Sequence, residues 1–436
     1  MRNKFIGIFV CMLIITTCVV PVIADTTNDT ADLPLNDAAF NLKISVLMKL
    51  VGCPSLATCI IKDDQIIWSK GYGYYDRSER KLATTDTIYN LASISKTITG
   101  TALMQLYEQG LFELDDDVNT FLPFDLRNPN FPDDPITFRM LLAHTSSLNE
   151  DPNDFYWENF SVDPPFNFYP ESFLREYLIP GGRYYEPSIW NMTYRPGEYL
   201  MYANVGFEII AYLVELISGE PFLEYCGTHI FSPLDMKHTG FNLSRFDINQ
   251  VAIPYLRYKG RYYTLNDLGL PYQYWRLRGY PAGGLYSTVS DLSHFLIAHM
   301  NDGVYNGTRI LKKETVELMH TPQSGNPIYG WSFWYCLAWY YETIWGINVS
   351  GHSGGNTGVS TYMFYNQTED IGVIALTNAC PGYFLPFGGS VLEHTIYYLL
   401  FTKEGTFKRE MQHEFTVSSN PLFITTLILS SEGGKT

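Results

Sequence analysis

The chain has 436 residues, of which 46% are apolar and 17% are charged, and its formal net charge at pH 7 is −16. This length and composition provide ample apolar material for a buried core, in one large domain or in two interleaved lobes. So acidic a chain is a poor partner for nucleic acids or anionic membrane surfaces, and its charge argues against those two classes of function.

The first 24 residues have the pattern of a secretory signal peptide. Arg2 and Lys4 precede an apolar run over 5–23, which ends in the small-residue cleavage pattern Val22-Ile23-Ala24. The run approaches the length of a membrane span, so a membrane anchor that is not cleaved is the alternative. Loss of the two basic residues would take the net charge from −16 to −18. Residues 25–36 are polar and are predicted to be a flexible lead-in.

Seven Asn-x-Ser/Thr sequons accompany this leader and suit a secreted protein that is glycosylated where the host has the machinery. They begin at Asn28, Asn159, Asn191, Asn242, Asn306, Asn348 and Asn366. An odd number of cysteines follows the leader, so at least one thiol is unpaired within the chain. Cys53 and Cys59 flank a predicted strand start, and a disulfide between them is one option. No Cys/His spacing typical of a zinc site occurs.

Beyond the leader, the first elements are a helix and a hairpin. Apolar residues at helical spacing predict a helix over 37–50. Two strands follow, over 55–62 and 65–73, joined by the hairpin signal Asp63-Asp64. A second helix is predicted to begin at Ser93 and to stop at Gly110, a residue suited to a C-terminal cap.

The middle of the chain is mostly helical. The segment 149–200 is rich in Pro, Asn, Tyr, Phe and Trp and has little periodicity, apart from a short helix near 173–178. Loops of this length in compact domains are usually functional or disordered, and the aromatic content argues against disorder, so we expect a lid or a pocket wall. The other helices predicted here span 136–142, 206–218, 221–230 and 290–301.

Strand signals dominate the C-terminal part. Strands are predicted over 331–340, 347–352, 360–365 and 371–377, with turns near 341–343 and 366–370 and a closing helix over 391–401. Because strands occur at both ends and helices lie between them, we predict an α+β fold. It would have one antiparallel sheet built from both chain ends, flanked by helices, with an inserted, mostly helical lobe and a cleft between lobes. The predicted domain covers 37–403, followed by a tail over 404–436.

Ser93 and Lys96 stand three residues apart at the start of the second helix, which places a hydroxyl and an ammonium on one face. An amine in this position can take the hydroxyl proton and make the serine a nucleophile. The positive end of the helix would also stabilise an oxyanion beside Ser93. Taken alone, the stretch is equally consistent with a helix cap. A competing Ser-x-x-Lys match, Ser78 to Lys81, lies in a polar connection with no apolar helix behind it.

Two further segments offer groups suited to the same reaction. Tyr202 and Asn204 are two apart in an extended turn, so they present a phenol and an amide to one site, and a phenol can act as a base. The stretch Gly351-His352-Ser353-Gly354-Gly355 ends a predicted strand, where glycine lets a substrate approach and a backbone N–H can complete an oxyanion hole. Each segment alone also has an ordinary explanation, a packed tyrosine or a glycine-rich turn.

Together, in this order and spacing, the three motifs resemble the serine β-lactamase and penicillin-binding-protein superfamily, specifically its class C-like branch. That branch holds class C β-lactamases, D-Ala-D-Ala carboxypeptidases, D-aminopeptidases and related esterases, with the pattern Ser-x-x-Lys, Tyr-x-Asn, then Lys-Thr-Gly or His-x-Gly. The resemblance runs from about residue 37 to about residue 400. It also includes Gly71-Tyr72-Gly73, Leu141-Leu142-Ala143-His144-Thr145-Ser146-Ser147-Leu148, Pro233-Leu234-Asp235-Met236 and Pro281-Ala282-Gly283-Gly284-Leu285.

The resemblance implies a role for each residue of the first two motifs. Ser93 would be the acylated nucleophile, and Lys96 would keep it activated. Tyr202 would move the proton as general base and then as general acid to the leaving group. Asn204 would hydrogen-bond the substrate and Lys96. We expect His144 to support the fold around the site.

For the third motif, the resemblance places His352 where class C β-lactamases have lysine. Gly354 would give a substrate close access, and the N–H groups of Ser93 and Gly355 would form the oxyanion hole, in which one donor typically accounts for about 3 kcal/mol of the barrier. An imidazole is mostly neutral at pH 7, so the histidine weakens the case for a β-lactamase. Asp235 replaces a glycine usual in the family, and we expect this to be structural.

The favoured hypothesis is a secreted serine hydrolase that works through an acyl-enzyme on Ser93. Peptidase activity of the D-residue or carboxypeptidase type, or esterase activity, ranks above β-lactamase activity. The alternative is a non-catalytic binding or sensor protein that retains the penicillin-binding fold, whose sign would be loss of Ser93, Lys96 or Tyr202, and all three are present. Neither hypothesis needs a metal or a cofactor. The substrate would be a small molecule or a peptide, and the sequence is silent on oligomeric state.

Overall fold

The computed structural model describes residues 37–149, 170–269, 279–325, 333–344, 346–379, 396 and 399–402. The chain divides into two units, 1–42 and 43–436. Helix α2 (Asp37–Val51), predicted over 37–50, crosses that boundary. No helix among these described residues is both long and apolar enough to cross a bilayer.

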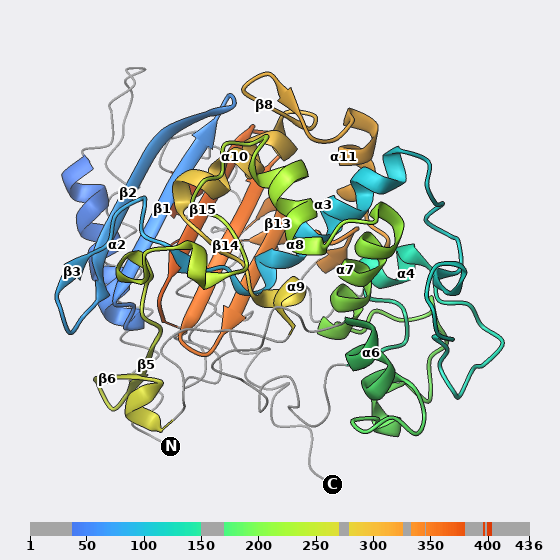
Figure 1. The fold of residues 1–436 in the computed structure, drawn as a ribbon. Coiled ribbons are helices and arrows are strands. Elements are labelled where there is room, and N and C mark those ends of the chain that lie inside the picture. The colour runs from blue at the N-terminus through green and yellow to red at the C-terminus, as the bar shows by residue number, and fades with distance from the viewer. Residues whose placement is uncertain are drawn as a thin grey trace, which may run out of the picture. The chain divides into compact units, whose positions relative to one another are not determined.

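The second unit contains an antiparallel sheet that has nine strands in the described residues, in the order β10-β11-β12-β13-β14-β15-β1-β2-β3 (Figure 1). Strand β1 (Ser55–Lys62) pairs on one side with β2 (Gln65–Asp76) and on the other with β15 (Ile371–Thr377). The first and last long strands therefore lie side by side, as predicted for a sheet built from both chain ends. The other strands of this sheet are β3 (Lys81–Leu82), β10 (Ser324–Gly325), β11 (Phe333–Tyr335), β12 (Tyr340–Ile344), β13 (Ile347–Asn356) and β14 (Val359–Asn366).

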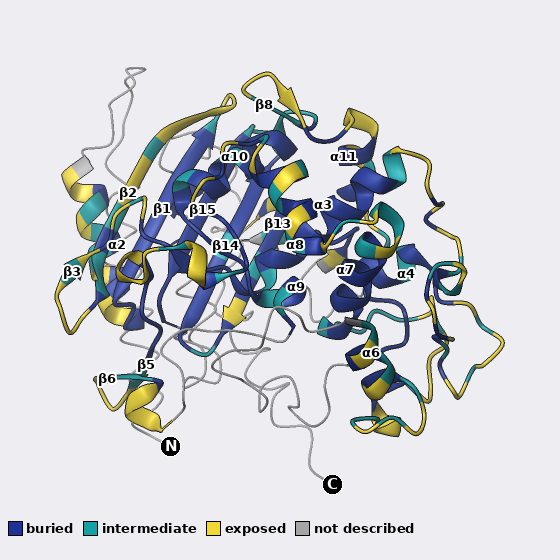
Figure 2. Ribbon diagram, in the orientation of Figure 1, coloured by how far each residue is buried: buried dark blue, intermediate teal, exposed yellow. Residues whose placement is uncertain are grey.

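The centre of the sheet is buried (Figure 2). Every residue of β15 is buried, as is β1 up to Ile61, which matches their nearly continuous apolar sequences. Helix α10 (Val289–Met300) packs on β1, β14 and β15. At Gly372 a Cβ would lie 2.7 Å from Met300 Sδ, so a larger residue there would displace the Met300 side chain.

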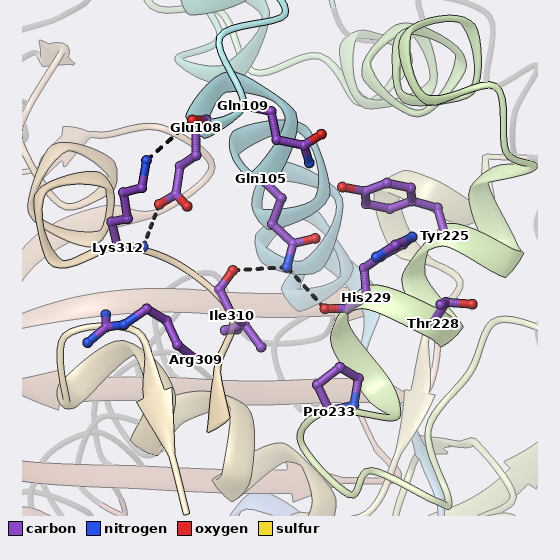
Figure 3. Close-up of a pocket in the computed structure, with 10 residues that line it drawn as sticks. All are labelled: Gln105, Glu108, Gln109, Tyr225, Thr228, His229, Pro233, Arg309, Ile310 and Lys312. Atoms are coloured by element: carbon purple, nitrogen blue, oxygen red, sulfur yellow. Dashed lines mark hydrogen bonds between the residues drawn. The ribbon is translucent and has the colours of Figure 1, made fainter. Parts of the chain in front are cut away.

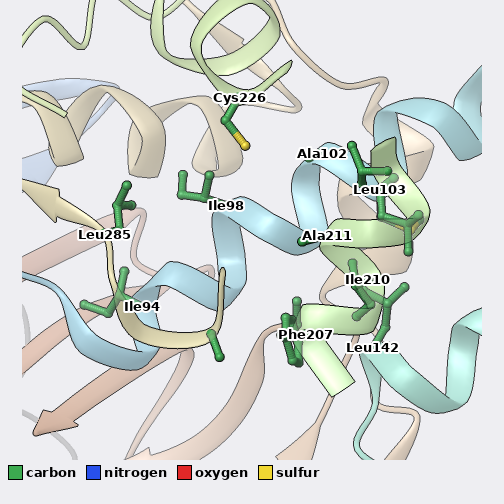
Figure 4. Packing of buried hydrophobic residues seen from close by; sticks show 14 of the residues in the cluster. Ile94, Ile98, Ala102, Leu103, Leu142, Phe207, Ile210, Ala211, Cys226 and Leu285 are labelled. Atoms are coloured by element: carbon green, nitrogen blue, oxygen red, sulfur yellow. The ribbon is translucent and has the colours of Figure 1, made fainter. Parts of the chain in front are cut away.

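Helix α3 (Ser95–Glu108) is the centre of the helical part and is buried on all sides from Ser95 to Leu106. It packs on α7 (Asn204–Ser218), and Figure 4 shows apolar side chains of both helices, Ala102 and Leu103 on α3 and Phe207, Ile210 and Ala211 on α7, with Leu142 beside them. At Gly100 a Cβ would lie 2.3 Å from Ala338 Cβ, so the turn before β12 can cross the helix only at a glycine. A helix enclosed in this way is a rigid support for residues at its N-terminus.

The remaining helices and strands are short. The helices are α4 (Phe138–Leu142), α6 (Pro170–Leu178), α8 (Phe222–Cys226), α9 (Tyr280–Gly283) and α11 (Lys313–Met319). Helical turns are η2 (Ala92–Ile94), η3 (Val118–Thr120), η4 (Pro187–Ile189), η5 (Gly227–Phe231, a π-turn), η6 (Leu243–Arg245), η7 (Ile248–Gln250) and η8 (Asn266–Leu268). Two-stranded pairs are formed by β4 (Tyr89–Asn90) with β7 (Tyr286–Ser287), β5 (Tyr255–Tyr258) with β6 (Arg261–Thr264), and β8 (Val304–Tyr305) with β9 (Thr308–Arg309).

Two predictions for the C-terminal strands were wrong. The single strand expected over 331–340 is interrupted, because 336–339 form a buried turn in which Ala338 has φ +63°. The turn expected at 341–343 is instead the middle of β12. The apolar run hid the reversal, since its turn residues are as buried as the strands. The closing helix predicted over 391–401 falls mostly outside the described residues.

Two other predictions concern the pairing of Cys53 with Cys59 and the lid over 149–200. Cys53 and Cys59 are not joined: both are buried free thiols, and Cys53 Sγ donates to Ser55 O at 2.9 Å. Burial raises the pKa of the Cys59 thiol to about 12, which makes it unreactive. Of the predicted lid, 150–169 lie outside the described residues. The rest of the segment contains α6, which confirms the short helix predicted near 173–178, and the helical turn η4.

A buried histidine pair lies beneath the sheet. Nδ1 of His299 and Nε2 of His320 are 3.2 Å apart, and the outer nitrogens reach Thr101 Oγ1 and Ser350 Oγ. Burial lowers the pKa of His320 to about 3 and that of His299 well below its usual value. Both imidazoles are therefore neutral in the folded protein across the physiological range.

Acid is expected to destabilise the protein through His320. The unfolded chain takes up this proton below pH ~6.5, whereas the folded chain does so only near pH 3. The contribution of His320 to the free energy of unfolding is complete above pH ~6.5. Below that pH it falls by about 1.4 kcal/mol per pH unit, so about 2 kcal/mol is lost at pH 5. Urea unfolding of wild type and His320→Gln at pH 7 and pH 5 measures this. An equal pH dependence in both proteins would contradict it.

Candidate active site

Ser93 lies in η2, a 3-10 turn that leads into α3, rather than in the first turn of the α-helix as predicted. Ala92 before it has φ +46°, an uncommon conformation for a residue with a side chain. Asn90 Oδ1 accepts from the Ala92 amide at 3.2 Å, and Ser95 Oγ donates to Ala92 O at 2.6 Å. These bonds impose the strained turn, which leaves Ser93 partly exposed while its neighbours are buried.

Lys96 is fully buried and is held by three acceptors. Its Nζ donates to Ser93 Oγ at 3.1 Å and to Asn204 Oδ1 at 2.7 Å. The third acceptor is the backbone carbonyl of Ala282 in α9, also at 2.7 Å. An ammonium has three N–H groups, so this set satisfies a buried charge that would otherwise be very costly.

The Tyr-x-Asn motif forms an extended turn that starts α7, as the sequence predicted. Ala203 has extended backbone angles, and Asn204 is the first helical residue. The Tyr202 ring lies 4.8 Å from Lys96 Nζ and 4.2 Å from the His144 ring, centroid to centroid. His144 also holds the backbone, because its Nδ1 accepts from Ala203 N at 3.1 Å and its carbonyl accepts from Met201 N at 2.7 Å.

The third motif lies within β13 rather than at a strand end, since that strand pairs with β14 as far as Asn356. Gly354 is packed on the nucleophile turn: a Cβ there would lie 2.2 Å from Leu91 O and 3.0 Å from Ser93 N. Thr361 Oγ1 in β14 donates to Leu91 O at 2.7 Å and fastens the turn to the sheet.

The other edge of β13 is open at this motif. Among the described residues, β12 pairs with β13 only as far as Gly351. The Ser353 N–H points to that edge, where Tyr340 Oη accepts it at 3.0 Å. Backbone groups alternate along a strand, so the Gly355 N–H, two residues on, points to the same side. Gly355 is exposed and directly follows Gly354, which lies against the Ser93 amide.

His352 is 2% exposed, and both of its ring nitrogens are engaged by protein groups. Nδ1 donates to Ser353 O at 2.5 Å, and Nε2 pairs with Tyr335 Oη at 2.9 Å. Burial, reinforced by the Lys96 charge, lowers the pKa of His352 to about 3. The imidazole is therefore neutral at pH 7 and is not a cationic clamp of the kind a lysine would provide.

The structure brings the predicted residues of the first two motifs together by direct contact and lays Gly354 against them. The sequence analysis missed Ala282, Thr361 and Tyr335. Ala282 contributes a backbone carbonyl, which no residue-type pattern reveals. The other two act through contacts between residues far apart in the chain.

The competing Ser-x-x-Lys match is a surface turn. Ser78 Oγ donates to Asp76 Oδ1 at 2.6 Å, and Lys81 Nζ pairs with Glu79 Oε2 at 2.5 Å. Lys81 thus pairs with acids, and no hydrogen bond joins it to Ser78 in the described structure. This settles which serine has the ammonium partner.

A cavity of about 410 Å³ lies at the other end of α3 (Figure 3). Gln105 spans its wall, donating through Nε2 to His229 O and Ile310 O, each at 3.0 Å. The lining is Gln105, Glu108, Gln109, Tyr225, Thr228, His229, Pro233, Arg309, Ile310 and Lys312. None of these residues belongs to the three motifs, so the cavity is separate from the chemistry at Ser93.

Gly354→Ala is expected to lower the free energy of unfolding by about 3 kcal/mol or more and to abolish activity. The added Cβ would lie 2.4 Å from Thr361 Oγ1 as well as 2.2 Å from Leu91 O, so the strand must move off the nucleophile turn. Gly355→Ala is the matched control, because a Cβ there meets nothing within 4 Å. Urea unfolding of both variants measures the difference, and equal losses would contradict the packing described.

Comparisons with known proteins agree with this geometry. A family profile described as Beta-lactamase matches residues 40–384. Putative penicillin-binding protein PbpX of Bacillus subtilis is 27% identical over 295 residues. That match covers 67% of this chain and 65% of the relative, less than two thirds of the relative's length.

Two solved structures extend the likeness to three dimensions. The octameric penicillin-binding protein homologue from Pyrococcus abyssi superposes with a TM-score of 0.68 at 26% identity, covering 84% of this chain and 78% of that one. The D-amino acid amidase from Ochrobactrum anthropi SV3 has a TM-score of 0.64 at 18% identity, covering 83% and 99%. At that identity, the second likeness concerns the fold alone.

Proposed function

Because the chain belongs to the Beta-lactamase family, we propose that it is a serine hydrolase that acts through an acyl-enzyme on Ser93. One observation supports this most strongly: the buried Lys96 ammonium lies 3.1 Å from Ser93 Oγ and is oriented by Asn204 and Ala282. A nucleophile beside a positioned amine is the arrangement that acyl transfer requires. The motif order Ser-x-x-Lys, Tyr-x-Asn, His-x-Gly is our basis for placing the chain in the class C-like branch.

Acylation would begin with attack of Ser93 Oγ on the substrate carbonyl. Tyr202, which lies against the Lys96 ammonium, would accept the hydroxyl proton and then pass it to the leaving group, and the Lys96 charge would stabilise the phenolate in between. The carbonyl oxygen would gain negative charge between the amides of Ser93 and Gly355. Water would then hydrolyse the ester on Ser93 by the same proton transfers in reverse.

For the substrate, we propose an ester or an amide, including peptides with a D-residue, ahead of a β-lactam. The neutral, fully engaged imidazole of His352 supports this order, because it offers no charge to a substrate carboxylate. A turnover screen with p-nitrophenyl esters, D-amino-acid amides and nitrocefin ranks the three classes directly.

A fluorophosphonate probe tests the proposed function. We expect one equivalent of probe on the native protein, seen as a single mass addition that maps to the peptide containing Ser93. No labelling of well-folded protein by fluorophosphonate or by penicillin, at any pH from 6 to 9, would overturn the proposal.

We also propose that the protein is secreted and, in a suitable host, glycosylated. The leader over 1–24 and the sequons support this. Of the sequons in the described residues, Asn306 at the tip of the β8–β9 hairpin and Asn348 are exposed, whereas Asn366 is 5% exposed and its Oδ1 accepts two backbone amides. N-terminal sequencing of the exported protein and mapping of its glycans test the proposal. Retention of residues 1–24, or the absence of glycans on Asn306 and Asn348, would contradict it.

A further inference from the structure

A continuous chain of hydrogen bonds runs through buried side chains next to the proposed active site. It begins at the Ala203 amide, passes through His144, Tyr335 and His352, and ends at the Ser353 carbonyl. The three side chains are 2%, 0% and 2% exposed. The four successive distances are 3.1, 3.0, 2.9 and 2.5 Å.

The two ends of the chain determine where every proton lies. Because the Ala203 N–H donates to His144 Nδ1, that nitrogen carries a lone pair and the proton is on Nε2, which donates to Tyr335 Oη. At the other end, the Ser353 carbonyl can only accept, so His352 carries its proton on Nδ1. His352 Nε2 is then an acceptor, and the Tyr335 hydroxyl donates to it. Neutral imidazoles in these two tautomers satisfy all four bonds and leave the Tyr335 hydroxyl proton with an acceptor.

The chain joins two segments that the proposed mechanism uses. Ala203 stands between Tyr202 and Asn204, and Ser353 immediately precedes Gly354 and Gly355. The Tyr335 oxygen is the atom through which the Tyr-x-Asn turn and the open edge of β13 are connected.

We propose that Tyr335 is a positioning residue for the reaction at Ser93, which rests on the proposed function. Its hydroxyl accepts from His144 and donates to His352, and by linking the two imidazoles it keeps the Tyr-x-Asn turn in register with the Ser353–Gly355 edge.

The opposite tautomer of His352 would turn a lone pair on Nδ1 toward the Ser353 carbonyl, which is 2.5 Å away. Two acceptors at that distance repel, so the carbonyl keeps the proton on Nδ1 and leaves Nε2 to accept from the Tyr335 hydroxyl. The carbonyl belongs to the backbone that carries the Gly355 amide two residues on. Through His352, Tyr335 is therefore connected to the proposed oxyanion hole without any contact with the substrate.

The surroundings of the chain favour the same neutral state. Lys96 on α3 carries a positive charge that lowers the pKa of both His144 and His352, in addition to the larger effect of burial. The other titratable groups facing the chain are Tyr202, Tyr340 and Cys336, and burial raises the pKa values of Tyr340 and Cys336, so that neither is an anion at pH 7. None of these groups is a carboxylate that would stabilise a protonated His144 or His352.

Tyr335→Phe tests the proposal by removing only the bridging oxygen. We expect kcat for the best ester or amide to fall about 10- to 100-fold, with KM within threefold of wild type, because the loss falls on the transition state. Tyr365→Phe is the matched control: it removes the hydroxyl of a buried tyrosine on β14, the strand that pairs with β13, where Gln367 Nε2 donates to it at 3.2 Å. This control is expected to keep kcat.

A spectroscopic readout keeps the proposal testable if Tyr335→Phe does not fold. Nitrogen-15 NMR of wild-type imidazoles, assigned with His352→Gln, should show His352 as the Nδ1–H form and His144 as the Nε2–H form. In Tyr335→Phe both tautomers should persist, because the Ala203 N–H and the Ser353 carbonyl set them, and the Nε2 resonance of His352 should shift because that nitrogen no longer accepts a hydrogen bond.

Either opposite tautomer in the wild type, or an unchanged kcat in folded Tyr335→Phe, would overturn the assignment to Tyr335. Failure of the wild type to react with fluorophosphonate would instead overturn the proposed function, and the NMR result would still stand by itself.

Discussion

Ser93→Ala is expected to remove labelling by fluorophosphonate completely and to lower kcat/KM by about 10⁴-fold or more. The substitution deletes the atom that forms the acyl bond, and knocking out the nucleophile of a serine hydrolase typically has an effect of this size or larger. The turn itself should persist, because Asn90, Ser95 and Thr361 hold it through bonds that do not involve the Ser93 hydroxyl. Intact-mass analysis and initial rates measure the effect.

The chain supplies its own control in Ser78→Ala. This substitution breaks the other Ser-x-x-Lys match, whose serine is hydrogen-bonded to Asp76 at the surface. Labelling and turnover should equal those of wild type. Loss of labelling in Ser78→Ala with retention in Ser93→Ala would reverse the assignment of the nucleophile.

Lys96→Met is expected to lower kcat/KM by about 10³-fold or more. Methionine has a similar length and no charge, so Ser93 Oγ loses its proton partner while the site keeps its volume. Asn204 Oδ1 and the Ala282 carbonyl also lose their donor, and a buried acceptor left unpaired costs about 1–3 kcal/mol. The rate of acylation in a single turnover, measured beside the free energy of unfolding, separates the two effects.

Lys81→Met serves as the matched control for the lysine. Lys81 is partly exposed and pairs with Glu79 at the surface, where ion pairs contribute little, so its removal should change neither acylation nor stability measurably. Lys96→Arg is expected to fail like Lys96→Met, because a planar guanidinium cannot occupy a fully buried site built around one ammonium. Full activity in Lys96→Met would remove Lys96 from the mechanism.

Much of the fold was readable from local pattern. The hairpin of β1 and β2 was predicted from alternating and apolar runs around Asp63-Asp64, and both aspartates do adopt the positive φ of a tight turn. Helices α3, α7 and α10 were predicted within a few residues, because their apolar positions repeat at helical spacing over several turns. The reversal of the chain before β12 was not predicted, because its four residues are apolar and buried and carry no turn signal.

The chemistry of the candidate site divides in the same way. The sequence alone determined the types and order of the reactive groups, because Ser93 with Lys96 and Tyr202 with Asn204 are local pairs. The sequence context already favoured Ser93 over Ser78. Only the tertiary structure showed which serine has the ammonium partner, supplied the Ala282 carbonyl, and joined the second motif to the third through Tyr335. The Lys96–Ala282 and His144–Tyr335 contacts link residues more than a hundred positions apart in the chain, and the Ala282 acceptor is a backbone atom that every residue has. Side-chain pattern along a sequence reports which face of an element is buried, and the packing of one element on another decides what meets there.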